Sequence, residues 1–307
     1  MVHRGKRPAA RPSRFGLQRS LRAGCIAGAF LLAAGCAAPK VIAVKTMKPI
    51  LEDSSEEILR SRDLETVGRG LPAQIMTVQG LQAAQPGDTE LTALAVQLHL
   101  FYAMGYVEDD DSGHAGILYT GGRDIGLQYF RCDDDLARAF DSKRVQVLEE
   151  ALDEIDEDEA PLLLWTAACW GGWVRLNLDD PAAVADLPLV EALLERVIAL
   201  APETFHGMPY ILRGTLLGLR PPALGGEPEA AREAFEDAFR ISGRRFLLAQ
   251  VYFARTYCKQ IFDRELFVET LEEVVDAPPD LLPEVRLLNR LAKRQARKWL
   301  DRVDEIF

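Results

Sequence analysis

The segment VEALLERVIALAP, residues 190–202, places apolar side chains at Val190, Leu194 and Val197 and ends in Pro202. Steps of four and three residues put these side chains on one face of an α-helix. A proline a few residues later cannot continue a helix, because it has no N–H to donate. The segment therefore predicts a helix that is buried along one face and ends near Pro202.

The same pattern, an apolar triplet followed by Pro or Gly, occurs in three other places. The copies are Leu148, Leu152, Ile155 and Pro161; Ala231, Phe235, Ala238 and Gly243; and Phe267, Leu271, Val274 and Pro279. Together the four triplets start 42, 41 and 36 residues apart, and a degenerate earlier copy begins at Gln74. This spacing and the A-x3-F-x2-A pattern are typical of the second helix of a tetratricopeptide-like repeat.

The fold class follows from these repeats and from the absence of any convincing run of alternating β-branched residues in the sequence. We predict an all-α fold, a tetratricopeptide-like helical solenoid of roughly six degenerate helix pairs. The signature of the first helix of each pair is poor, so an unrelated helix bundle remains the alternative.

The charge of the chain is unevenly distributed, which limits its partners. The 307 residues are 48% hydrophobic and 27% charged, with a formal charge of −11, as expected of a globular protein. Residues 1–35 hold seven Lys or Arg and no acid, whereas the rest holds 29 bases and 47 acids, a net charge of −18. Because phosphate groups bind clustered Lys and Arg, we expect no nucleic-acid partner.

The first 35 residues are predicted to be a signal peptide. Basic residues precede the apolar stretch Ala23–Gly35, whose thirteen residues are too few to span a bilayer as a helix. The stretch leads into Cys36 through small residues and resembles a bacterial lipoprotein box. Cys36 is therefore the predicted lipid-attachment site. The alternative is an ordinary secretory signal with a coincidental cysteine.

Three segments follow from this interpretation: a signal peptide over residues 1–35, a lipidated cysteine and tether over 36–54, and a single α-helical repeat domain over 55–307. Pro39 and Pro49 disfavour a helix in the tether. We expect a periplasmic, lipid-anchored protein. Ala37 favours the outer membrane, because Asp usually marks retention in the inner membrane at this position.

The sequence contains no recognisable catalytic or cofactor motif. It lacks the GxSxG, HExxH, phosphate-loop and dinucleotide patterns. The acidic runs Glu108–Asp111, Asp133–Asp135 and Asp153–Glu159 are interpreted as solvated faces and turns, since a loop begun at Asp109 lacks the Gly and Glu spacing that calcium requires. We expect a protein that is not an enzyme and has no metal and no cofactor.

Three of the four tryptophans lie within nine residues, around a Gly-Gly pair in a predicted helix. The segment runs from Trp165 to Asn177 and includes Trp170, Gly171, Gly172 and Trp173. A glycine inside a helix costs about 1 kcal/mol relative to alanine, so a compensating contact is expected. Either the glycines allow close helix packing beneath a tryptophan-rich core, or the segment forms a groove where a ligand or partner stacks on an indole.

A second candidate site is the loop Arg220–Pro228, which contains Gly225 and Gly226. Pro228 suits the first turn of a helix. The free amides at that helix start could bind an anion, with Arg213 or Arg220 supplying positive charge. The alternative is a long, stiff loop between helices.

The segment from Glu284 onward is predicted to cap the C-terminal end of the repeats. Leu287, Leu288 and Leu291 offer apolar contacts. The basic residues of this segment are Arg286, Arg290, Lys293, Arg294, Arg297, Lys298 and Arg302. We expect them to form an outward face that keeps the end of the solenoid soluble; docking to an acidic partner is the alternative.

The chain resembles the T-component proteins associated with TRAP transporters. The resemblance covers most of residues 55–300. It rests on the lipoprotein start and on Trp165–Asn177, Leu187-Pro188 ahead of Val190–Pro202, Arg220–Pro228, and Phe246–Tyr257 followed by Asp263–Phe267. It implies a periplasmic α-helical lipoprotein with tetratricopeptide-like repeats that forms a homotrimer and associates with the substrate-binding subunit of a TRAP transporter, which captures organic acids or other small ligands.

The expected function is thus a non-enzymatic scaffold that docks this subunit and relays or shelters its ligand. The alternative is a general tetratricopeptide-type envelope lipoprotein that mediates protein contacts in cell-envelope assembly. The resemblance assigns no ligand-binding residues, so the candidate sites above depend only on the residue patterns.

Overall fold

The computed structural model describes residues 34–219, 226–278 and 280–307, with side chains from Val44 onward. The chain divides into two compact units, Met1–Thr46 and Met47–Phe307. Every regular element in the described ranges is a helix, which confirms the predicted all-α class. The side chain of Cys36, and residues Arg220 and Gly225, lie outside the described part of the chain.

Helix α2, Ala34–Arg60, includes the residues that we predicted as a tether. The expectation that Pro39 and Pro49 disfavour a helix there is therefore wrong. Proline fixes φ at a value that suits a helix, and its cost is the loss of one backbone hydrogen bond and a local clash. The neighbouring Ala, Val, Lys and Met residues continue the helix through both positions.

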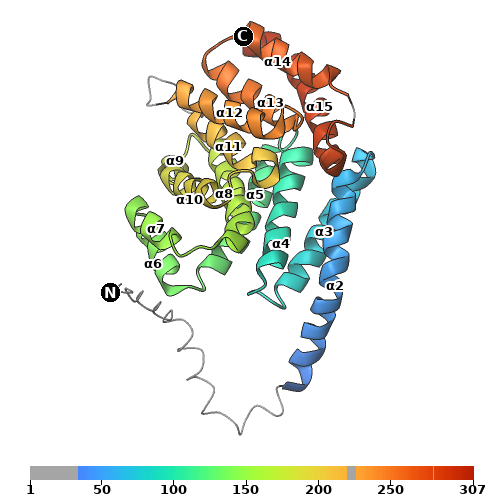
Figure 1. Cartoon of the computed structure of the whole chain (residues 1–307), viewed down its shortest axis with the longest axis vertical. Helices are drawn as coiled ribbons and strands as arrows, with labels where there is room; N and C mark the ends of the chain where they lie inside the picture. Colours follow the sequence, from blue (N-terminus) through green and yellow to red (C-terminus); the bar gives the residue numbers. More distant parts are fainter. Residues whose placement is uncertain (1–33, 220–225, 279) are drawn as a thin grey trace, which may run out of the picture. The chain divides into compact units, whose positions relative to one another are not determined.

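Helices also make up the second unit beyond α2 (Figure 1). The longer ones are α3 (Leu64–Gln82), α4 (Thr89–Tyr102), α5 (Ser112–Phe130), α6 (Asp134–Ser142), α7 (Val145–Leu152), α8 (Ala160–Leu176), α10 (Leu187–Leu200), α11 (Thr204–Leu217), α12 (Pro228–Ser242), α14 (Arg264–Asp276) and α15 (Arg286–Leu300). The short ones are η2 (Glu157–Glu159), α9 (Pro181–Ala185), α13 (Leu248–Phe253), η5 (Pro283–Val285) and α16 (Val303–Ile306). Two segments, η1 (Ala103–Val107) and η4 (Ala254–Cys258), are π-helices.

Aspartates begin several of these helices. The carboxylates of Asp63, Asp88, Asp111, Asp133 and Asp263 each accept backbone N–H bonds from the first turn of the helix that follows. Such a cap satisfies amides that have no partner inside the helix. Two of the acidic runs in the sequence therefore contain helix caps, at Asp111 and Asp133, as the interpretation of these runs as turns requires.

The four apolar triplets lie in the core, as predicted. Every one of their twelve side chains is at most 2% exposed. The triplets of α10, α12 and α14 lie within one helix each, whereas α7 ends at Leu152 and leaves Ile155 beyond its end. Gly243 ends α12 with φ +58°, a backbone conformation that glycine adopts without the steric cost of a side chain.

Helix α8 is largely buried, with twelve of its seventeen residues buried. It contacts α4, α5, α10 and α11, which surround it in Figure 1. Its sequence, APLLLWTAACWGGWVRL, is apolar on nearly every side. A helix that is apolar all round is buried rather than lying at the surface, and α8 carries the segment from Trp165 onward.

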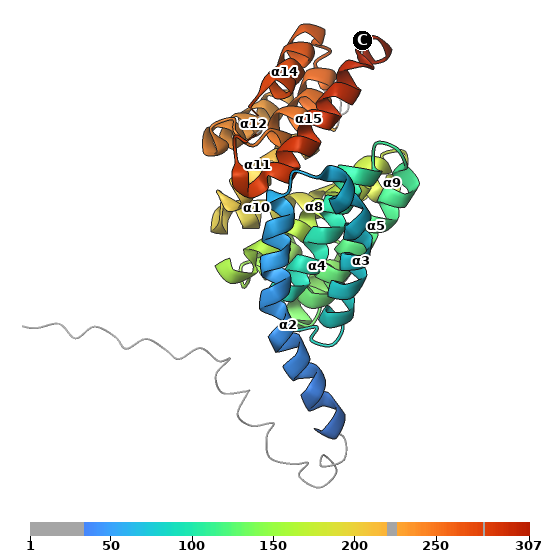
Figure 2. The ribbon, with the colours of Figure 1, turned by 90° about the vertical axis from the view of Figure 1, so that its right-hand side faces the viewer.

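The C-terminal helix α15 packs against the early part of the second unit. Leu291 approaches Gly105 of η1 so closely that a methyl group on this glycine would lie 2.8 Å from it. Gln295 donates a hydrogen bond of 2.8 Å to the carbonyl oxygen of Met104, and Arg286 donates one to the carbonyl of Arg60. Figures 1 and 2 both show the start of α15 beside the connection between α2 and α3.

We had expected the basic residues of α15 to form only an outward face. The structure shows that several of them instead contact neighbouring segments of the chain. Arg294 donates to the carbonyl of Gly105, Lys293 donates to the carbonyl of Ala277, and Lys298 pairs with Asp110. These cations attach the helix to its neighbours, while Leu287, Leu288 and Leu291 are buried as predicted.

Candidate functional site

Two of the three tryptophans of the α8 segment lie in the core. Trp165 is 4% exposed and makes edge contacts with Phe101 and Phe205, at ring-centroid distances of 5.6 and 5.0 Å. Trp170 is 5% exposed, and its Nε1 donates a hydrogen bond of 3.1 Å to Asp186. Burial of both rings favours the core-packing interpretation for these two positions.

Trp173 keeps part of its surface. It is half-buried, and the guanidinium of Arg123 lies 5.2 Å from its ring centroid. Asn177 donates a hydrogen bond of 2.7 Å to the carbonyl of Trp173 and so ends α8 locally. Of the three indoles of this segment, Trp173 is the most exposed.

The Gly-Gly pair allows close packing between helices. A methyl group on Gly172 would lie 2.8 Å from the Tyr119 ring of α5, and one on Gly171 would lie 3.3 Å from Leu216 of α11. The absence of side chains at both positions therefore brings α5 and α11 close to α8. This contact compensates for the low helix propensity of glycine.

The loop candidate is described only in part. Arg213 pairs with Glu195 at 3.1 Å, so its charge is at least partly neutralised within the chain. Gly226 precedes α12, and Pro228 is in the first turn of that helix as predicted. Arg220 and Gly225 lie outside the described residues.

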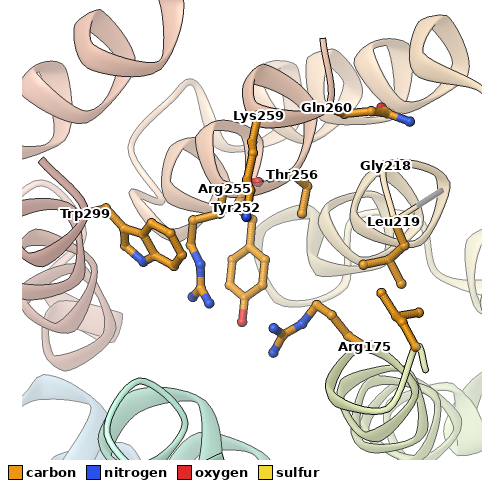
Figure 3. Close-up of a pocket in the computed structure, with 10 residues that line it drawn as sticks. Arg175, Gly218, Leu219, Tyr252, Arg255, Thr256, Lys259, Gln260 and Trp299 are labelled. Carbon is orange, nitrogen blue, oxygen red and sulfur yellow. Dashed lines mark hydrogen bonds between the residues drawn. The ribbon is translucent and has the colours of Figure 1, made fainter. Parts of the chain in front are cut away.

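The structure shows a cavity of about 410 Å³ that we had not predicted. Its volume is within the range of small-molecule sites. Figure 3 shows its lining, which comes from the end of α8, the end of α11, the α13–η4 segment and α15: Arg175, Leu178, Gly218, Leu219, Tyr252, Arg255, Thr256, Lys259, Gln260 and Trp299. The α8 segment thus contributes Arg175 to this cavity, whereas Trp170 of the same segment lines a separate, open groove.

A buried ion cluster holds one wall of this cavity. Glu108, with its side chain 2% exposed, pairs with Arg175 and accepts a bond of 2.9 Å from Nη2 of Arg255. Tyr119 donates its hydroxyl hydrogen to the same carboxylate. Asp109 lies 3.7 Å from Arg255. In Figure 3 the guanidinium groups of Arg175 and Arg255 lie on either side of the Tyr252 hydroxyl.

The cluster keeps Glu108 charged. Burial alone would raise the pKa of Glu108, but the charges of Arg175 and Arg255 and the bond from Tyr119 lower it to about 2. Burial and the nearby carboxylate raise the pKa of Tyr252 to about 12, so this phenol stays protonated. The cavity wall therefore has fixed charges at neutral pH.

Both π-helices contribute to this cluster. The N–H of Glu108 closes η1 by bonding to the carbonyl of Ala103, five residues earlier, at 2.9 Å. Arg255 lies inside η4, and the N–H of Lys259 closes that segment on Ala254. π-Helical turns are rare and are frequently found at functional sites. Their coincidence at one ion cluster marks this region as the candidate site.

Reasoning from the sequence missed most of these residues. Glu108 begins an acidic run that we interpreted as solvated, and Arg255, Tyr252 and Trp299 lie in stretches without a chemical motif. One signal was present: Glu108 directly follows the apolar residues Ala103–Val107, which places its side chain close to the core.

The fold and the site define a class of protein. In the described residues every regular element is a helix, and a ligand-sized cavity lined by cations lies beside a buried ion cluster. The family model of the TRAP transporter T-component matches residues 60–307. The chain therefore belongs to the TRAP transporter T-component family, which confirms the resemblance seen in the sequence.

A relative from Treponema pallidum (strain Nichols) has similar length. It is an uncharacterized protein that is 24% identical to this chain, over 92% of this chain and 96% of its own length. Its name assigns it no activity or partner.

Within the described residues, the structure contains no helix with the length and apolar character needed to cross a membrane.

Proposed function

We propose that the protein is a non-enzymatic, lipid-anchored scaffold of the periplasm, which docks the substrate-binding subunit of a TRAP transporter and relays or shelters a small organic acid. Membership of the T-component family over residues 60–307 carries this proposal. That membership supports a role as the T-component of a TRAP system. The cavity beside Glu108 supports the ligand part of the proposal, because its volume suits a small molecule.

The same proposal includes the finer architecture and the anchor. The helices pair as tetratricopeptide-like units, roughly six in number, and the buried triplets of α7, α10, α12 and α14 support this pairing. Three copies of the chain form a homotrimer, as the family resemblance implies. Lipidated Cys36 attaches the protein to a membrane, with Ala37 favouring the outer one.

Trp173 and Arg123 are the surface that we assign to docking. The indole is half-buried and its ring lies 5.2 Å from the guanidinium. Arg123 also lines an open groove of about 600 Å³, whose charged residues are Arg123, Arg131, Lys143, Asp124 and Asp186 and whose lining includes Trp170. Tryptophan and arginine are enriched among the residues that dominate protein interfaces, and removing one commonly costs about 2 kcal/mol or more of binding energy.

The test is the affinity of purified variants for the cognate substrate-binding subunit, measured together with thermal stability. Trp173→Ala should weaken association about thirty-fold while the melting temperature changes little. Trp170→Ala should instead destabilise the fold by about 3–5 kcal/mol, because this ring is buried. Met76→Ala, at a 74% exposed position of α3, is the matched surface control and should change neither quantity.

Wild-type affinity of the Trp173→Ala variant would contradict the assigned docking surface. Failure of the wild-type protein to bind the subunit at all would favour the alternative, a general envelope lipoprotein. Genes for a TRAP binding subunit and its membrane permeases next to this gene are the expected genomic context under the proposed function.

A further inference from the structure

The cavity beside Glu108 has an unbalanced lining. Three cations, Arg175, Arg255 and Lys259, line it, and no acidic residue does within the described part of the chain. Two carboxylates, Glu108 and Asp109, lie behind this lining and pair with the arginines. The three cations of the lining and the two carboxylates behind it therefore give this region a net charge of +1.

Lys259 carries the positive charge that no carboxylate of the cluster neutralises. Its side chain is exposed at the cavity and forms no ion pair with any residue that the structure describes. Arg175 and Arg255, in contrast, are held in place by Glu108, at the exit of η1. A fixed pair of guanidinium groups beside one exposed ammonium is an arrangement that attracts a single negative charge.

The cluster itself does not fully use the Arg255 guanidinium. Its side chain is 9% exposed, and Nη2 serves both Glu108 and Asp109. Nη1 is closed off from solvent and has no hydrogen-bond partner among the described residues. A buried charged donor without an acceptor is costly, so positive charge remains at this wall that the chain does not satisfy.

The rest of the lining is apolar or uncharged. Leu178 and Leu219 belong to the lining. In Figure 3 Leu219 lies on the side of Arg175, and the Trp299 ring lies on the opposite side. This ring is fixed between the guanidinium groups of Arg255 and Arg302, 4.8 and 5.7 Å from its centroid. An apolar body of limited size would therefore contact leucine and indole once its charged end had reached the cations.

We propose that this cavity binds an organic monocarboxylate, with its carboxylate at Lys259 and Arg175 and its apolar body against Leu178, Leu219 and Trp299. Glu108 is a positioning residue, because it orients both arginines without lining the cavity itself. The identification of this anion as the cargo rests on the proposed function, whereas its binding requires no partner protein.

The experiment is calorimetric titration of the isolated chain from Ala37 to Phe307, which lacks the predicted signal peptide and Cys36, with sodium hexanoate. We expect a dissociation constant of about 1 mM or tighter, given the efficiency of small ligands. Lys259→Met should weaken binding about ten-fold, because a charge-assisted contact is lost, and Lys259→Arg should restore it. Since Lys259 is exposed, both variants should melt at the wild-type temperature.

The matched control is Lys298→Met. This lysine does not line the cavity and pairs with Asp110, so the same change of charge should leave hexanoate binding unaltered. Hexanamide, which is neutral, should bind at least about ten-fold more weakly than hexanoate. Succinate should also bind more weakly, because its second carboxylate would take the place of the apolar body that contacts Leu178, Leu219 and Trp299.

Equal binding of hexanoate and hexanamide would overturn the proposal. So would tighter binding of succinate, an equal loss in Lys298→Met, or no binding of hexanoate to the wild-type chain. These outcomes are independent of docking. A chain that binds hexanoate but not the transporter subunit contradicts the proposed function alone, and a chain that docks but binds no monocarboxylate contradicts only the cavity assignment.

Discussion

Glu108 is a carboxylate that remains charged although its side chain is almost wholly removed from water. Desolvation opposes this state, and two arginines and a tyrosine offset it. Taking one partner away from such a cluster leaves uncompensated charges in a buried place, which typically costs about 3–5 kcal/mol. The residue is therefore important for stability as well as for the geometry of the cavity.

The pH dependence of stability provides a test of this residue. The pKa of Glu108 is about 2 in the folded chain, below its ordinary value of 4.5. The stability that the charged form contributes is thus present above about pH 4.5 and is lost as the pH falls towards 2. Glu108→Gln should be less stable than wild type by about 3 kcal/mol at pH 7, and the gap should narrow as the pH falls to 3.

Urea unfolding of both proteins at pH 7, 4 and 3 measures this gap. Asp109→Asn is the control, since this neighbouring carboxylate is more exposed and should change stability by less than about 1 kcal/mol. A gap that stays constant with pH would contradict the assigned charge state of Glu108.

At the residue scale, patterns predicted burial of apolar side chains but not the ion cluster. Phe235 and Leu271 are fully buried, as helical spacing indicates. Whether a charged residue is buried depends on partners from distant parts of the chain: Arg175 is 67 residues and Arg255 147 residues away from Glu108. Local sequence contains no record of such pairs.

At the scale of elements, the effect of replacing a helical glycine by alanine depends on the space beside it. Where a neighbouring side chain lies close, the added methyl group should destabilise the fold, and where the space is open it should stabilise the helix. Gly172 of α8 faces the Tyr119 ring, whereas Gly70 of α3 has no atom within 4 Å of where a methyl group would be. Helix propensity favours alanine at both positions by about 1 kcal/mol. Only the neighbouring ring makes the two sites different.

We therefore expect Gly172→Ala to destabilise the protein by about 1–3 kcal/mol, the usual cost of overpacking, and Gly70→Ala to stabilise it by up to about 1 kcal/mol. Thermal unfolding of the two variants beside wild type measures both effects. Shifts in the same direction would mean that α5 and α8 do not approach each other as closely as described.

Element types followed from the sequence more reliably than their ends. The triplets of α10, α12 and α14 predicted these helices. The prolines of α2 did not end that helix, because each proline removes only one backbone hydrogen bond from an otherwise helical stretch. The π-helices could not be predicted, since a turn one residue wider leaves no recognisable mark on apolar spacing.

At the scale of the whole second unit, α15 connects the end of the chain to its earlier part. Its contacts with Arg60, Met104 and Gly105 join residues that are far apart in sequence. A repeat array whose last helix is attached only to its neighbour could lose that helix independently. Here the loss of α15 exposes η1 as well.

We therefore predict that the unit unfolds in one transition. Circular dichroism and the fluorescence of Trp165, Trp170 and Trp173, measured in a Trp299→Phe variant, should give the same midpoint. A chain that ends at Leu282 should have a clearly lower midpoint, because Leu291 and Gln295 no longer cover η1. Unchanged stability of the shortened chain would contradict this role of α15.

The proposed anchor has its own test at this scale. Wild-type protein expressed in a Gram-negative host should incorporate labelled palmitate and partition with membranes, and Cys36→Ser should do neither. Cys132→Ser, at an exposed free cysteine, is the control and should keep the label. A wild-type chain that takes up no label and stays in the soluble fraction would show that the lipoprotein assignment is wrong.

The two π-helical turns have a consequence for insertions and deletions. Each turn holds one residue more than an α-helical turn, and one residue corresponds to about 100° of rotation about the helix axis. Deleting a single residue from Ala254–Cys258 would restore α-helical winding and rotate either Arg255 or Lys259 away from the cavity. The charge arrangement is therefore encoded in chain length as well as in residue identity, and substitutions that keep every cation could not rescue such a deletion.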